Sequence, residues 1–114
     1  MIEQDIYTAL SAVVALGNRI YPKIMPQKTD KPAAVYSIVS MVDNSGLSGC
    51  VLSQTARAQI DIYTLTFEEG VRIRNEVKAS LYSSKLSISD MQNFDDYEDE
   101  TELFRQIIDF SVRR

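Results

Sequence analysis

Two stretches of the chain alternate strictly between apolar and polar residues, and this alternation constrains the fold more than any other feature. In residues 54–65 one set comprises Ala56, Ala58, Ile60 and Ile62, and the intervening set Arg57, Gln59, Asp61 and Tyr63. In residues 103–112 Phe104, Ile108, Phe110 and Val112 alternate with Arg105, Asp109 and Ser111, Gln106 falling in the first set and Leu103 and Ile107 in the second. Residues two apart on a strand point to the same face of a sheet. Each stretch therefore predicts a strand with one core face and one polar face.

Helical spacing of apolar residues predicts two helices beside these strands. From Ile2 to Leu16 the apolar residues recur at helical intervals, and Gly17 follows as a helix-ending signal. Thr66 and Glu69 form the T-x-x-E pattern of a capping box, which predicts a second helix ending near Tyr82.

Three further segments complete the predicted fold. Residues 33–42 are rich in β-branched residues and predict a strand covered on both sides, preceded by a short strand near 19–21. Residues 43–53 hold two glycines with Asp, Asn and Ser, and predict a loop. Leu86 and Ile88 open a weaker strand that fades into an acidic run. The sequence predicts an α+β fold, an antiparallel sheet of four to five strands with two helices packed on one face, in a single domain spanning 1–114.

Charge is unevenly distributed along the chain. Of 16 Asp and Glu residues, seven lie between Asp90 and Glu102, a run without any base. The 12 Lys and Arg residues form no cluster of the kind that neutralises nucleic-acid phosphates, so autonomous nucleic-acid binding is not expected. No apolar stretch approaches the roughly 20 residues of a membrane span, and the first residues lack the basic region of an export signal. Neither membrane insertion nor export is expected.

The residue types needed for common catalytic sites are missing from the sequence. The chain has no histidine, its one cysteine is Cys50, and no glycine-rich phosphate-binding motif occurs. We therefore expect no catalytic residues, no cofactor and no metal site. The acidic residues 95–102 lack the EF-hand pattern and are interpreted as a solvated hairpin connection. The alternative is a small carboxylate-based metal-binding module or hydrolase centred on them.

Oppositely charged residues lie four apart in both alternating segments, namely Arg57 with Asp61 and Arg105 with Asp109. If the two strands are neighbours, these residues can form a cross-strand ladder of ion pairs. The face is then either an ordinary solvated surface or one that is buried against another copy of the chain, and both interpretations stay open. The candidate interface residues are Arg57, Asp61, Tyr63, Arg105 and Asp109.

Four blocks of sequence carry a family resemblance. They read R-I-Y-P-x-I-x-P-Q at 19–27, P-A-x-V-Y-S-I at 32–38, A-R-A-Q-I-D-I-Y-T-x-T-F-E-E at 56–69 and Y-E-D-E-T-x-L-F-R-x-x-x-D-F-S at 97–111. In this order the chain resembles the tail-completion, or tail-to-head joining, family of long-tailed bacteriophages and prophages. The resemblance covers nearly the whole chain. The acidic run is heavier than expected for the family, and the turn between the second and third strands carries a cysteine.

The resemblance implies a structural protein, the tail terminator, rather than an enzyme. Such a subunit closes into a ring, typically hexameric, at the head-proximal end of the tail tube, and can be monomeric in isolation. Its implied partners are copies of itself, the tail-tube protein and a head-completion or connector protein, with DNA only as passing cargo and no membrane. It would reside in the host cytoplasm during assembly and then in the virion tail or neck. The alternative within this class is a head-side neck or stopper protein.

The resemblance also implies a role for the loop between the second and third strands. Related ring proteins use this loop against neighbours or the tube, and the residues concerned here are Asn44, Gly46, Leu47 and Gly49. The acidic run would face solvent, a neighbouring subunit or the channel, where negative charge would let DNA slide without sticking.

Overall fold

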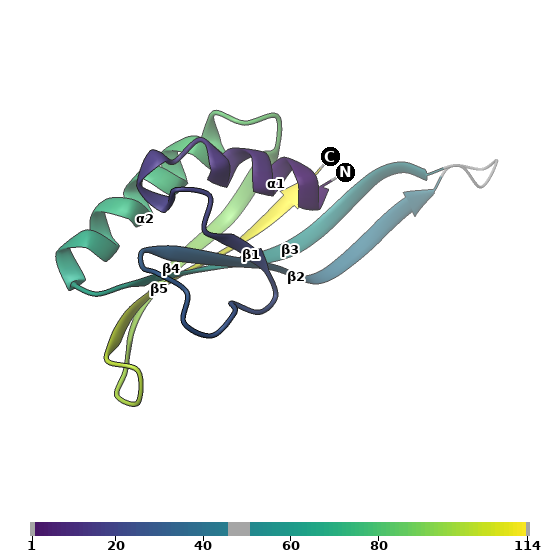
Figure 1. Ribbon diagram of the computed structural model, residues 1–114. Coiled ribbons are helices and arrows are strands. Elements are labelled where there is room, and N and C mark those ends of the chain that lie inside the picture. The colour runs from purple at the N-terminus through teal and green to yellow at the C-terminus, as the bar shows by residue number, and fades with distance from the viewer. Residues whose placement is uncertain (1, 46–50, 114) are drawn as a thin grey trace.

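The computed structural model describes residues 2–45 and 51–113, in which five strands and two α-helices follow one another in the order shown in Figure 1. The elements are α1 (Ile2–Ser11), a 3-10 turn η1 (Val14–Leu16), β1 (Ile20–Pro22), β2 (Ala33–Ser45), β3 (Val51–Thr64), α2 (Phe67–Tyr82), β4 (Ser87–Glu98) and β5 (Leu103–Arg113). None of the helices among these residues is long and apolar enough to cross a membrane.

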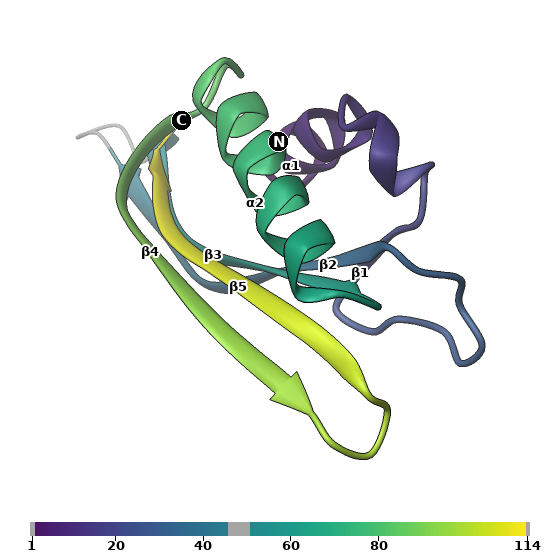
Figure 2. The same ribbon diagram turned by 90° about the vertical axis from the view of Figure 1, so that its left-hand side faces the viewer.

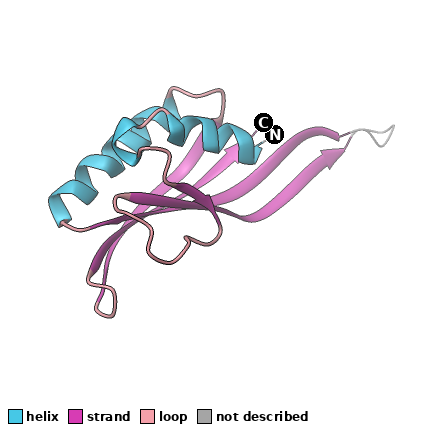
Figure 3. Cartoon of the chain, viewed as in Figure 1, coloured by secondary structure: helices cyan, strands magenta, loops and turns pink. Residues whose placement is uncertain are grey.

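The strands form one sheet in the order β1-β2-β3-β5-β4. All neighbouring pairs are antiparallel except β1 and β2, which are parallel. Both helices lie on the same face of the sheet, and the other face is left open (Figure 3). The predicted α+β class with two helices on one face is thus confirmed, and the parallel β1 makes the sheet mixed.

The hydrophobic core lies between the helices and the covered face of the sheet. Ile6 and Leu10 of α1, Ile73 and Val77 of α2 and Ile60 of β3 are fully buried there. The predicted apolar sets of both alternating segments face this core, and the predicted polar sets lie on the open face. The period-2 pattern therefore identified the orientation of β3 and β5 correctly.

The helix boundaries follow local chemistry. The hydroxyl oxygen of Thr66 accepts a hydrogen bond from the Glu69 amide at 3.2 Å, which caps α2 as predicted. The first helix is shorter than predicted, because α1 ends at Ser11 and Val13 adopts an extended backbone. Two successive β-branched valines fit a helix poorly, and the chain continues as η1 until Gly17, whose φ of 55° ends that turn.

The predicted loop at 43–53 and the predicted two-sided burial of β2 are both wrong in part. Residues 43–45 pair with strand β3 and extend the ladder, because strand pairing overrides the turn preference of Asp and Asn. Strand β1 pairs only with Ala34–Tyr36, so the rest of β2 lacks a neighbour on that side. Val39 and Val42 are accordingly 65% and 59% exposed. The outer parts of β2 and β3 project from the helix-covered body as an arm (Figure 1).

The acidic run is also more regular than predicted. Asp95, Asp96 and Glu98 belong to β4, where they pair with Gln106, Arg105 and Leu103 of β5. The hairpin connection is therefore limited to residues 99–102. A strand at the edge of a sheet tolerates charged residues because its outer side meets water, which the expectation of a fading strand overlooked.

Candidate functional site

The five predicted interface residues lie together on the open face, where β3 runs antiparallel to β5. A guanidinium nitrogen of Arg57 lies 2.7 Å from an Asp109 carboxylate oxygen, and one of Arg105 lies 3.0 Å from Asp61. The predicted cross-strand ladder is therefore confirmed, with each cation paired to the acid of the opposite strand. Tyr63 completes the group, since its ring centroid is 5.9 Å from the Arg105 guanidinium carbon.

The two ion pairs differ in burial. The Asp61 and Arg105 side chains are 13% and 25% exposed, against 29% for Asp109 and 38% for Arg57. Burial opposes the charge of the Arg105 guanidinium, but its hydrogen bond to Asp61 and the charge of that carboxylate raise its pKa overall. Burial raises the pKa of the Tyr63 phenol, and the nearby Arg105 charge offsets part of this rise. The ladder is thus a partly desolvated polar surface whose charges are already paired.

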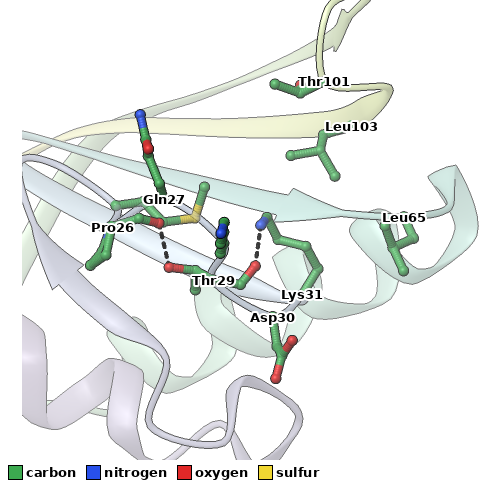
Figure 4. A pocket seen from close by; sticks show the side chains of 10 residues that line it. Pro26, Gln27, Thr29, Asp30, Lys31, Leu65, Thr101 and Leu103 are labelled. Atoms are coloured by element: carbon green, nitrogen blue, oxygen red, sulfur yellow. Dashed lines mark hydrogen bonds between the residues drawn. The ribbon is translucent and has the colours of Figure 1, made fainter.

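A groove lies beside the ladder on the open face. The segment between β1 and β2 folds beneath the sheet, where the Thr29 hydroxyl donates to the Pro26 carbonyl and the Lys31 ammonium to the Thr29 carbonyl. Figure 4 shows this segment facing Leu103 across a cavity of about 630 Å³. The segment also explains why Ala33 is fully buried on the uncovered side of the sheet. Sequence reasoning noted only that its prolines exclude a helix, and did not place it.

Three exposed aromatic rings meet at the other end of the sheet. The ring centroids of Tyr97 and Phe104 are 4.9 Å apart, and those of Phe67 and Phe104 are 6.1 Å apart. Together with Asp95 and Asp96 they line a cavity of about 390 Å³. The rings come from β4, β5 and the first turn of α2, which explains why a reading of separate sequence segments missed the cluster.

The carboxylates of the acidic run do not converge. Among residues 2–45 and 51–113, no three Asp, Glu or Cys side chains are placed to hold one metal ion. Nothing in this geometry favours the metal-site alternative. Of the four predicted partner-loop residues, Asn44 lies in β2 near the end of the arm, and Gly46, Leu47 and Gly49 lie outside the described residues.

Comparison with known proteins agrees with this architecture. The chain is similar in fold to a chain in the virion of a native gene transfer agent particle, with a TM-score of 0.59 and 14% sequence identity over 95% of this chain and 90% of that one. A search of curated protein sequences found no match. The family described as "Tail completion protein gp17" matches residues 4–114. Because this match spans nearly the whole chain, the chain belongs to the tail completion protein gp17 family and is a structural, tail-related phage protein.

Proposed function

We propose that this protein forms a ring, hexameric as is typical of such subunits, that caps the head-proximal end of the tail tube and offers the head its docking surface. The observation that carries the proposal is the continuous family match over residues 4–114. The ring assembles in the host cytoplasm and ends in the tail or neck of the virion. Its partners are its own copies, the tube protein and a head-completion or connector protein, and DNA passes through it as cargo. Its work is done by binding and not by catalysis.

The shape of the subunit supports this proposal. A closed ring needs two different surfaces on each subunit, each complementary to the other. The sheet offers such surfaces because it ends in two different strands, β1 on one side and β4 on the other. The open-face residues Arg57, Asp61, Tyr63, Arg105 and Asp109 are further candidates for contact between copies, although their charges are already paired within the chain.

The arm of β2 and β3 is the proposed contact with the tail tube. It extends beyond the helices, and the apolar Val39 and Val42 are exposed on it. Exposed apolar side chains away from the core are typical of surfaces that another protein covers. The partner-loop residues Asn44, Gly46, Leu47 and Gly49 belong to the same arm or follow it in sequence.

The proposal is tested with purified protein and purified tail tubes. Light scattering after size-exclusion chromatography measures the mass of the free protein, and electron microscopy shows whether a ring sits on one end of each tube. The double variant Val39→Ser/Val42→Ser should weaken tube binding, while Tyr82→Ser, an exposed aromatic on α2, should not. A pull-down against connector protein separates this function from that of a head-side stopper. Protein that stays monomeric and ignores tube ends would refute the proposal.

A further inference from the structure

The two ends of the sheet carry opposite charge. Figure 2 shows β4 along one side of the molecule and the segment between β1 and β2 on the other. The β4 end and its hairpin hold seven acids in residues 90–102. The segment that leaves β1 holds Lys23, Lys28 and Lys31, with Asp30 as its one acid. Within residues 2–45 and 51–113, neither outer edge pairs with a further strand.

At the β4 end, the aromatic cavity presents apolar rings beside unneutralised acids. Phe67 and Tyr97 are 47% and 44% exposed. The Asp96 carboxylate accepts a hydrogen bond from the Tyr97 amide, and the Arg74 guanidinium lies 3.6 Å from Asp95. Arg105, which is opposite Asp96 in the ladder of β4 and β5, is paired with Asp61. A site of this kind favours an apolar side chain flanked by cations, because cations are attracted both to carboxylates and to aromatic faces.

The β1 end presents such a group. Ile24 is 79% exposed and directly follows Lys23, whose amide donates to the Tyr36 carbonyl at 2.9 Å and so extends the edge of β1 by one residue. Lys28 is also exposed. In the described part of the chain neither Lys23 nor Lys28 forms an ion pair. An exposed isoleucine beside free lysines has no packing role within its own subunit.

We propose that the two ends meet between copies of the chain: Ile24 of one copy seats in the cavity of Phe67, Tyr97 and Phe104 of the next, with Lys23 and Lys28 facing Asp95 and Asp96. This inference rests on the proposed ring and names the surfaces that close it. Because the two surfaces differ and lie at opposite ends of one sheet, each copy binds one neighbour at each end. Repetition of such a contact generates a ring when the rotation closes.

Charge reversal tests the pairing. In Lys23→Glu/Lys28→Glu and in Asp95→Lys/Asp96→Lys, like charges face each other, and the association constant between copies should fall about tenfold or more. The four substitutions combined in one chain restore opposite charges and should restore the ring. The matched control Lys78→Glu/Lys85→Glu changes the net charge as much as the first variant, at and just beyond the far end of α2, and should leave the ring intact. Sedimentation velocity measures association, and circular dichroism checks that each variant is folded.

The outcomes separate this inference from the proposed function. If wild type forms rings and both charge-reversed variants do so equally well, the pairing of sheet ends is wrong and the ring proposal stands. If both variants lose the ring and the fourfold variant does not regain it, the pairing is again wrong, and the acidic end faces another partner. If wild type forms no ring, either free or on tube ends, both proposals fail.

Crosslinking gives an independent measurement that does not depend on charge. With Cys50→Ser as background, Ile24→Cys and Tyr97→Cys place one thiol at each end of the sheet, too far apart to join within one chain. Oxidation of assembled rings should give a ladder of covalent oligomers. The matched control Ile24→Cys/Tyr82→Cys should give none, and equal ladders from both pairs would overturn the inference.

Discussion

The two faces of β3 and β5 are built from the same strands but do different work. On the covered face Ile60, Ile108 and Phe110 are fully buried beneath the helices. On the open face the positions between them hold ion pairs and a half-buried tyrosine. The first face stabilises the subunit by removing apolar surface from water. The second gains little stability from exposed charges but remains soluble until a partner covers it, so stability and assembly are assigned to alternate residues.

The sharpest test of this division uses two neighbouring isoleucines of β5. Ile108 is fully buried on the covered face, and Ile107 is half-buried on the open face. Ile108→Ala should lower the free energy of unfolding by about 2–5 kcal/mol, because it leaves a cavity in the core. Ile107→Ala should cost about 1 kcal/mol, since less apolar surface is lost there. Urea denaturation of dilute protein measures both values.

Protein concentration sharpens this first comparison. If the open face is covered by another copy in assembled protein, the cost of Ile107→Ala should grow with concentration while that of Ile108→Ala changes less. Equal costs for the two substitutions in dilute protein would show that the faces are not distinct in the way described.

Gly70 provides a second way to disturb the covered face. A Cβ atom at this position would lie 2.9 Å from the Thr64 hydroxyl oxygen and 3.2 Å from Cγ of Gln106, both on fully buried residues. Thr64 cannot move away easily, because its hydroxyl donates to the Thr66 carbonyl at 2.8 Å. Gly70→Ala should therefore destabilise the protein by about 1–3 kcal/mol, although alanine is the better helix former.

The matched control for Gly70 is Asn75→Ala on the exposed side of the same helix. This substitution should slightly raise the melting temperature through helix propensity alone. If Gly70→Ala also raised the melting temperature, the close approach of α2 to the sheet would not be a packing constraint.

The sequence predicted those parts of the molecule that depend on local pattern. Alternation in β3 and β5 identified both faces and the ladder, because a strand's period of two leaves no other arrangement. The capping box located the start of α2 for a similar reason, since Thr66 and Glu69 interact within one turn.

The features that were missed depend on contacts between distant segments. The aromatic cavity combines Phe67 with Tyr97 and Phe104, which only the order of β5 and β4 brings together. The arm formed because residues 43–45 found partners in β3, which outweighs their preference for turns. Such pairings cannot be seen in a single segment.

The ladder of the open face should contribute less than either change to the core. A double-mutant cycle on Arg57→Ala and Asp109→Ala should give a coupling energy of about 0.2–1 kcal/mol, smaller in about 1 M salt. The same cycle on Asp61 and Arg105 should give a larger value, because these side chains are less exposed. Thermal unfolding at low and high salt measures both cycles. A larger coupling for the more exposed pair would mean that burial does not set the strength of the ladder.

The smallest expected effect concerns alkaline pH and compares a tyrosine on each face. Burial is the main cause that raises the pKa of Tyr63 on the open face and of Tyr36 on the covered face above the ordinary value of 10.0. A raised pKa in the folded state means that folding favours the protonated phenol. The resulting stability is fully present below the unfolded pKa and is lost as pH rises through the folded pKa.

Free energies of unfolding at about pH 8 and about pH 11 should therefore show a loss that is smaller in Tyr63→Phe and in Tyr36→Phe than in wild type. Absorbance of the ionised phenol gives the titration directly. In assembled protein the titration of Tyr63 should move further upward if another copy covers the open face, because burial of the phenol increases. That of Tyr36, already enclosed by α1 and the sheet, should not move. A Tyr63 titration that is the same in dilute and assembled protein would place the contact between copies away from the ladder, at the two ends of the sheet alone.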